Sequence, residues 1–143
     1  MTQLVCDTNF LMKITNQSLP KLSDFISNNH FEIATVSSVI RELNGLKKSK
    51  KNSVARNAKN CLGLIGTKVH LRDGGSLDEP SKEADIELFE LAKSLEEGSL
   101  VATLDGKLLS RFERNRLPYL TLRNDRPFLQ SFHRATYLST RKD

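Results

Sequence analysis

The chain has 143 residues, of which 38% are hydrophobic and 27% are charged, and its formal net charge is +5. These values predict one soluble domain that is large enough to bury a core. No apolar run approaches the length of a membrane span and the first residues lack a basic-then-apolar signal pattern, so we expect a cytoplasmic protein without membrane contact.

The first half of the chain alternates between strand and helix patterns. Short apolar runs predict strands over residues 3–6, 31–36 and 68–71. Apolar residues at helical spacing predict helices over residues 10–15, 19–26, 39–47 and 54–65. Cys6 and Cys61 lie among these apolar residues, which is typical of reduced core thiols in a cytosolic protein.

The second half continues the alternation after a turn expected at residues 73–75. Helices are expected over residues 81–95 and through Leu108 and Phe112, and strands over residues 100–104 and 118–122. Such alternation favours a parallel sheet with helices on both faces. The segment from Asn124 onward has no clear pattern, although its aromatic residues suggest that part of it packs.

Positive charge is concentrated in two parts of the chain. Residues 107–143 carry nine Lys and Arg and three Asp and Glu, and a second basic stretch without acids begins at Lys47. This asymmetry indicates a polyanionic partner, and nucleic acid fits best. For the lysine run alone, a solubilising surface is an equal alternative.

Four acidic residues stand where a solvated side chain is unusual. Asp7 and Asp105 each follow a predicted strand, and ligands of parallel sheets bind at such strand ends. Glu42 and Asp85 fall on the apolar faces of two predicted helices. Taken singly, the two strand-end acids could simply cap the helices that follow them, and Asp85 could favour the start of its helix.

Together the four acids indicate a cation site. Gathered carboxylates repel one another and raise each other's pKa, so a fold brings them together to hold a cation. Oxygen ligands favour Mg²⁺ or Mn²⁺. A zinc site is not expected, because His30, His70 and His133 are scattered and none pairs with a cysteine at ligand spacing.

Four segments, each with one of these acids, resemble the acidic motifs of PIN-domain ribonucleases in order and spacing. They are Asp7-Thr8-Asn9-Phe10-Leu11, Val39-Ile40-Arg41-Glu42-Leu43, Glu83-Ala84-Asp85 and Val101-Ala102-Thr103-Leu104-Asp105. The resemblance implies a three-layer α/β/α sandwich with a mostly parallel sheet over residues 1–130, followed by a basic tail over residues 131–143. It also implies a divalent-metal-dependent endoribonuclease in which metal-activated water cuts the RNA.

The resemblance assigns a role to each motif residue. It implies that Asp7, Glu42, Asp85 and Asp105 are catalytic and ligate Mg²⁺ or Mn²⁺. It implies that Thr8, Asn9 and Thr103 support these acids through hydrogen bonds. We expect the basic side chains to hold the RNA backbone, namely Lys47, Lys48, Lys50, Lys51, Arg111, Arg114 and Arg116.

Residues 117–123 further resemble the branch of this family that processes ribosomal RNA, so such processing is the implied function. Two positions depart from the pattern: Ile86 follows Asp85 where that branch often has a second acid, and Leu104 replaces the usual Asn before Asp105. The toxin of a toxin–antitoxin pair and a non-cleaving RNA-binding or assembly scaffold stay open as alternatives. Besides RNA, the candidate partners are an antitoxin, a ribosome-assembly protein or a second copy of the chain.

Overall fold

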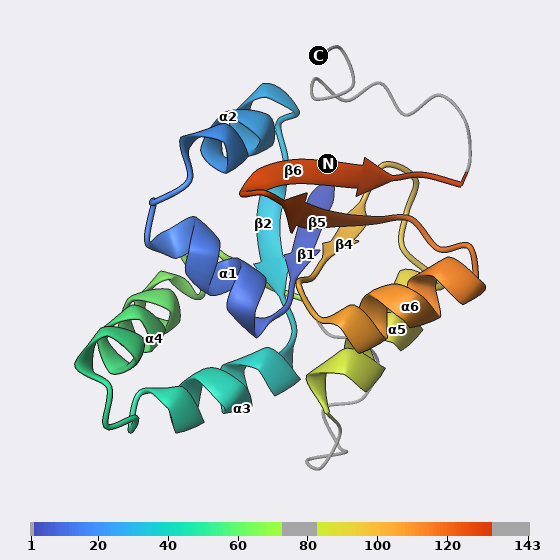
Figure 1. Ribbon diagram of the computed structural model, residues 1–143. Coiled ribbons are helices and arrows are strands. Elements are labelled where there is room, and N and C mark those ends of the chain that lie inside the picture. The colour runs from blue at the N-terminus through green and yellow to red at the C-terminus, as the bar shows by residue number, and fades with distance from the viewer. Residues whose placement is uncertain (1, 73–82, 133–143) are drawn as a thin grey trace.

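The computed structural model describes residues 2–72 and 83–132, which form six strands and six helices (Figure 1). The strands are β1 (Gln3–Cys6), β2 (Glu32–Thr35), β3 (His70–Leu71), β4 (Leu100–Ala102), β5 (Tyr119–Arg123) and β6 (Arg126–Gln130). The helices are α1 (Thr8–Thr15), α2 (Pro20–Asn28), α3 (Ser37–Leu46), α4 (Asn52–Leu64), α5 (Ala84–Ala92) and α6 (Gly106–Arg114). The expected α/β class is confirmed.

The six strands form one sheet in the order β3-β2-β1-β4-β5-β6, and only the β5–β6 pair is antiparallel among the described strands. The chain adds β2 and β3 on one side of β1 and then crosses to add β4 on the other side. The carboxyl ends of β1 and β4 therefore lie side by side where the direction of growth reverses. Open α/β sheets bind ligands in the crevice at such a switch point.

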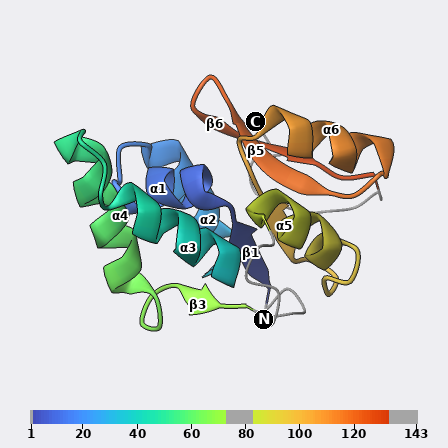
Figure 2. The same ribbon diagram turned by 90° about the horizontal axis from the view of Figure 1, so that it is seen from below.

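The helices form two groups on either side of β1, with α1–α4 in one group and α5 and α6 in the other (Figures 1 and 2). The second group is joined to the sheet by a chain of aromatic contacts. The ring of Phe112 on α6 lies 6.0 Å from that of Phe89 on α5 and 6.2 Å from that of Tyr119 on β5, centroid to centroid. These large buried rings fix α5 and α6 against β5.

The strand expected over residues 118–122 is present as β5, but the strand that follows it was not predicted. The chain turns back at Asn124 and Asp125 into β6, which pairs antiparallel with β5. Both turn residues have positive φ, 52° and 62°, as in a two-residue hairpin turn whose twist matches that of its strands. β6 is half-buried and contains Pro127, which a strand tolerates at the edge of a sheet.

The bounds of the other elements agree closely with the prediction, and Cys6 and Cys61 are buried free thiols as expected. The turn expected at residues 73–75, the first two residues of the helix expected over 81–95, and the tail from residue 133 lie outside the described residues. No helix in the described part of the chain is both long enough and apolar enough to cross a membrane.

Candidate active site

A cavity of about 490 Å³ lies at the switch point of the sheet, and all four acids identified in the sequence line it. Each acid comes from a different element. Asp7 follows β1, Glu42 lies on α3, Asp85 lies at the start of α5 and Asp105 precedes α6. Viewed from below, α1, α3, α5 and α6 gather around β1 (Figure 2). The fold thus brings together carboxylates that are far apart in the chain.

Asp7 is the most buried of these acids, with 8% of its surface exposed. Its Oδ1 accepts the backbone N–H of Phe10 at 2.8 Å, which caps α1. Its Oδ2 accepts the hydroxyl of Thr103 and, at 3.3 Å, the N–H of Leu104. Burial raises the pKa of Asp7; the hydrogen bonds oppose this rise, and the nearby charge of Asp105 adds to it.

Asp105 stands after the neighbouring strand β4 and is exposed. Its Oδ1 caps α6 by accepting the N–H of Lys107 at 2.8 Å and that of the next residue at 3.2 Å. Thr103 links the two strand-end acids, because its hydroxyl donates to Asp7 and accepts the N–H of Asp105 at 3.0 Å. Leu104 lines a hollow between α6 and β5, and the Asp105 cap forms with leucine at this position.

Glu42 and Asp85 reach the cavity from the two different groups of helices. Glu42 Oε1 accepts the hydroxyl of Thr8 at 2.6 Å, which ties α3 to the start of α1. Glu42 is exposed, because its side of α3 borders the cavity and not the core. Asp85 is half-buried and accepts the N–H of Ile86 at 3.0 Å. Asn9 also lines the cavity, and its side chain is exposed.

Two charged residues of the cavity wall were not predicted from the sequence. Glu83 precedes α5 and Lys107 lies in the first turn of α6. Glu83 stands two residues before the predicted acid Asp85, and Lys107 stands two residues after Asp105. This closeness in the chain is the sequence feature that could have indicated both. Lys107 places a positive charge in a wall that is otherwise acidic or uncharged.

A further acid, Glu87, connects the two helices that carry Glu42 and Asp85. It is only 2% exposed and accepts the backbone N–H of Ser38 at 3.1 Å together with the Ser38 hydroxyl. Ser38 lies in the first turn of α3, where helix N–H groups have no partner within the helix. The Glu87 carboxylate on α5 thus supplies a hydrogen-bond acceptor to the first turn of α3, and this contact joins the two helices.

The predicted RNA-binding residues fall into two groups that lie apart (Figure 1). Lys47, Lys48, Lys50 and Lys51 belong to the connection between α3 and α4 and are exposed. The arginines lie on α6 or just after it, in the other group of helices. Arg111 and Arg114 line a shallow depression on α6 together with Lys107. The arginine group therefore adjoins the cavity along α6.

Two of these arginines lie over aromatic rings. The Arg111 guanidinium is 4.0 Å from the ring centre of Phe89, and that of Arg116 is 5.1 Å from the ring centre of Phe132. The cation–π attraction helps to hold each guanidinium over its ring.

The chemistry of the donor set fits a hydrated divalent cation. Within residues 2–72 and 83–132, no three His, Cys, Asp or Glu side chains stand close enough together to ligate one ion. The carboxylates surround the cavity instead of converging on a point. Hard cations such as Mg²⁺ keep several waters and take only one or two carboxylates directly, so they suit this arrangement.

Known proteins resemble the chain in structure and not in sequence. No protein-family model matches the chain, and no curated protein sequence does. A solved structure described as the PIN domain endonuclease Utp24 is similar over 91% of this chain and 92% of the other, with a TM-score of 0.63. The sequence identity is 19%, so this likeness concerns the fold. The chain has the fold of a PIN domain.

Proposed function

We propose that the protein is a metal-dependent endoribonuclease that cuts phosphodiester bonds within RNA. The observation that carries this proposal is the grouping of Asp7, Glu42, Asp85 and Asp105 around one cavity at the switch point of the sheet. Carboxylates drawn together from four elements repel one another unless a cation shares their site. The likeness to a structure described as an endonuclease adds support.

One or two of the four acids would ligate Mg²⁺ or Mn²⁺ directly, and the others would contact the waters that the ion keeps. When bound, such an ion would supply a more acidic water for attack on the phosphate and would offset negative charge there. Thr103 orients Asp7, and Thr8 orients Glu42, through the hydrogen bonds of their hydroxyl groups. No protein nucleophile is required.

Positive side chains on α6 would bring the RNA to the acids. RNA and carboxylates repel one another, so the strand needs cationic contacts beside the cavity. Lys107 lies in the cavity wall, and Arg111 and Arg114 continue the positive charge along the helix. The resemblance of residues 117–123 to the branch that processes ribosomal RNA supports ribosomal RNA as the target class.

Cleavage by the purified protein tests the proposal. In Mg²⁺ or Mn²⁺, the protein is expected to cut single-stranded or loop RNA internally, and EDTA is expected to stop the reaction. Asp85→Asn should remove cleavage, whereas the matched Asp24→Asn change, at an exposed acid of α2, should not. RNA that is bound but never cut would support the scaffold alternative. RNAs crosslinked in cells to the inactive variant would identify the target.

A further inference from the structure

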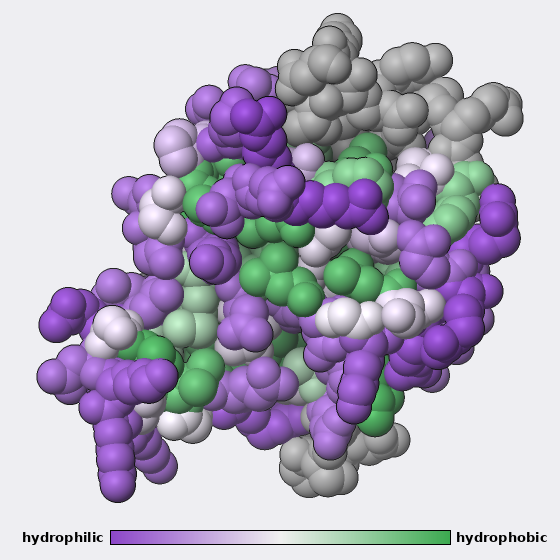
Figure 3. Space-filling model, in the orientation of Figure 1, coloured by the Kyte–Doolittle hydropathy of each residue, from purple (hydrophilic) through white to green (hydrophobic). Residues whose placement is uncertain are grey.

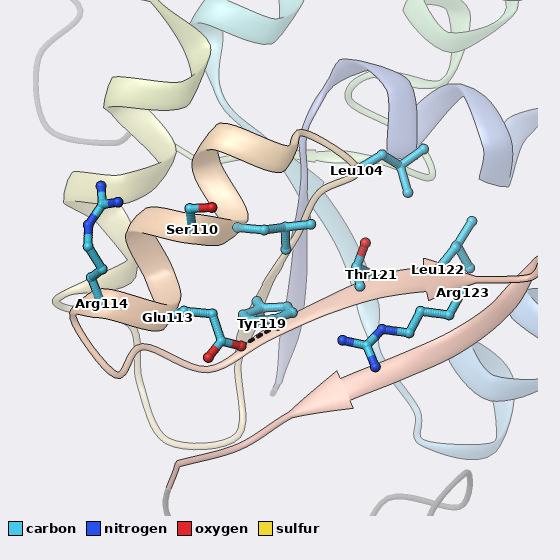
Figure 4. A pocket seen from close by; sticks show the side chains of 9 residues that line it. Leu104, Ser110, Glu113, Arg114, Tyr119, Thr121, Leu122 and Arg123 are labelled. Atoms are coloured by element: carbon cyan, nitrogen blue, oxygen red, sulfur yellow. Dashed lines mark hydrogen bonds between the residues drawn. The ribbon is translucent and has the colours of Figure 1, made fainter.

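A second hollow, of about 690 Å³, lies between α6 and β5 (Figure 4). Leu104, Leu109 and Leu122 are half-buried and give it an apolar lining, while Ser110 and Thr121 add hydroxyl groups. Figure 3 shows apolar side chains at the surface of this face of the molecule, surrounded by hydrophilic ones. An apolar hollow with a few polar groups at its wall is typical of a ligand pocket of this size.

The surface of α6 connects the hollow to the cavity of the acids. A shallow depression on α6 shares Lys107 with the cavity, and shares Ser110 and Arg114 with the hollow. Lys107, Arg111 and Arg114 are spaced by four and three residues, so they follow one face of the helix. Cationic side chains therefore line the way from the acids to the hollow.

The charge of the hollow suits a phosphate-linked ligand. Arg114 contributes from the helix and Arg123 from the strand, and the Arg123 guanidinium is held 3.6 Å from the ring centre of Phe128. The acid of the hollow, Glu113, accepts the hydroxyl of Tyr119 at 2.6 Å (Figure 4). With two arginines and one carboxylate, the hollow has a rim of net positive charge around an apolar floor.

We propose that this hollow is a nucleotide subsite for the single-stranded RNA that leaves the acids along α6. A base would pack against Leu104, Leu109 and Leu122, and its phosphates would contact Arg114 and Arg123. A nucleotide combines an apolar ring face with an anionic backbone, which matches this combination of floor and rim. The inference rests on the proposed function, because it takes the phosphate at the acids as its starting point.

An abasic scan of the RNA tests the subsite. The probe is a single-stranded oligoribonucleotide in which one base at a time is removed on either side of the cut phosphate, and binding is measured to the full-length Asp7→Asn protein in Mg²⁺. One position near the cut is expected to weaken binding about tenfold when its base is missing. The same scan is repeated after adding Leu109→Gln or Leu122→Thr, which suit a helix and a strand respectively.

Each added change should lower the affinity for intact RNA about tenfold and remove the penalty of that one abasic position. The matched control is Leu71→Gln, at an exposed leucine of β3, which should change neither quantity. Two variants on separate elements guard against misfolding of either one. If the abasic penalties are the same in all four proteins, the proposal is overturned.

Failure of the proposed function gives a different result. Wild-type protein that leaves the intact oligoribonucleotide uncut in Mg²⁺ and Mn²⁺ would overturn the nuclease proposal. A base penalty that depends on Leu109 and Leu122 would still establish the hollow as an RNA subsite in that protein.

Discussion

Asp7 uses its two oxygens for two purposes. One oxygen caps α1, and the other is held by Thr103 and Leu104 at the wall of the cavity. Burial and the charge of Asp105 raise the pKa of Asp7, so the ionised form costs more here than in water. A cation in the cavity would favour the ionised form again. Metal binding should therefore offset the energetic cost of burying this carboxylate.

Asp7→Asn removes the charge and keeps an oxygen for the cap. We expect the cleavage rate to fall at least about 100-fold, because metal ions supply several kcal/mol of transition-state stabilisation. In EDTA at pH 7, the free energy of unfolding should stay equal or rise, because a buried charge is lost. Assays with end-labelled RNA and urea unfolding measure these effects. Cleavage at the wild-type rate would mean that Asp7 serves only as a cap.

Glu87 is expected to matter for stability. Glu87→Ala leaves the buried N–H of Ser38 without its acceptor, which should lower the free energy of unfolding by about 3 kcal/mol. Glu87→Gln keeps an acceptor oxygen and should cost less. Glu90→Ala, at an exposed acid of the same helix, is the matched control and should cost less than about 0.5 kcal/mol. Similar small losses in all three variants, measured by urea unfolding, would show that the contact is dispensable.

Among the helices, α6 carries charges that suit its dipole. Asp105 caps its N-terminus, and Arg111 and Arg114 lie in its last turn. These arginines could therefore serve the helix alone, and RNA binding distinguishes that explanation from the proposed one.

Changing Arg111 and Arg114 together to Gln should weaken binding to RNAs of any sequence, because phosphate contacts carry little sequence information. The slope of log affinity against log salt should become shallower by about 1.4, since each contact with a single strand contributes about 0.7. Affinity is measured against KCl in Ca²⁺. The same changes at Lys50 and Lys51 provide the comparison for the other basic stretch. An unchanged slope would assign the arginines to the helix dipole.

The short edge strand β3 is tied to the loop before β4 by an ion pair. The Arg72 guanidinium donates to Glu96 at 2.5 and 2.9 Å, which lowers the pKa of Glu96 from its usual 4.5 to about 2. Because the pKa is lower in the folded state, the pair stabilises the fold above pH 4.5 and loses this effect as the pH falls toward 2.

Arg72→Gln should therefore lower the free energy of unfolding at pH 7 and leave it unchanged near pH 2. The loss should be less than about 1 kcal/mol, because nearly half of the Glu96 side chain is exposed to solvent. Urea unfolding of both proteins across this pH range measures the difference. A loss that is independent of pH would instead reflect the hydrogen bond from Arg72 to Gln3.

The elements that the sequence predicts well are those with a regular apolar pattern. β4 is an uninterrupted apolar run because it is buried on both faces, so its position follows directly, although the expected strand extended two residues further. β6 has no such pattern, because it lies at the edge of the sheet, is half-buried and contains Pro127. Its signal was the turn at Asn124 and Asp125, two residues that tolerate positive φ.

The same contrast holds within the cavity. Asp7 interrupts an apolar segment and is visible in the sequence, whereas Glu83 and Lys107 look like ordinary charged residues at helix starts. The burial of Glu87 depends on Ser38, 49 residues away, and no local pattern contains such a contact. Distances between the acids likewise come from packing and not from the sequence pattern.

The fold of the whole molecule gathers four carboxylates around one cavity, where they repel one another, so cation binding should stabilise the folded protein. Mg²⁺ at ten times its dissociation constant should raise the melting temperature by about 4 °C, because it binds only the folded state. Thermal melts are compared at equal ionic strength in KCl, since salt alone screens the repulsion between carboxylates. Asp105→Asn should remove most of the shift. An equal shift in KCl would mean that Mg²⁺ acts only by screening.

The two outer strands of the sheet have a consequence for the behaviour of the protein at high concentration. An open strand edge offers its backbone to other chains and can seed aggregation. Here one edge, β3, has only two residues, and the other, β6, contains Pro127, which lacks a backbone donor. Neither edge is a good template for adding a foreign strand. Pairing of strand edges between copies of the protein is therefore disfavoured.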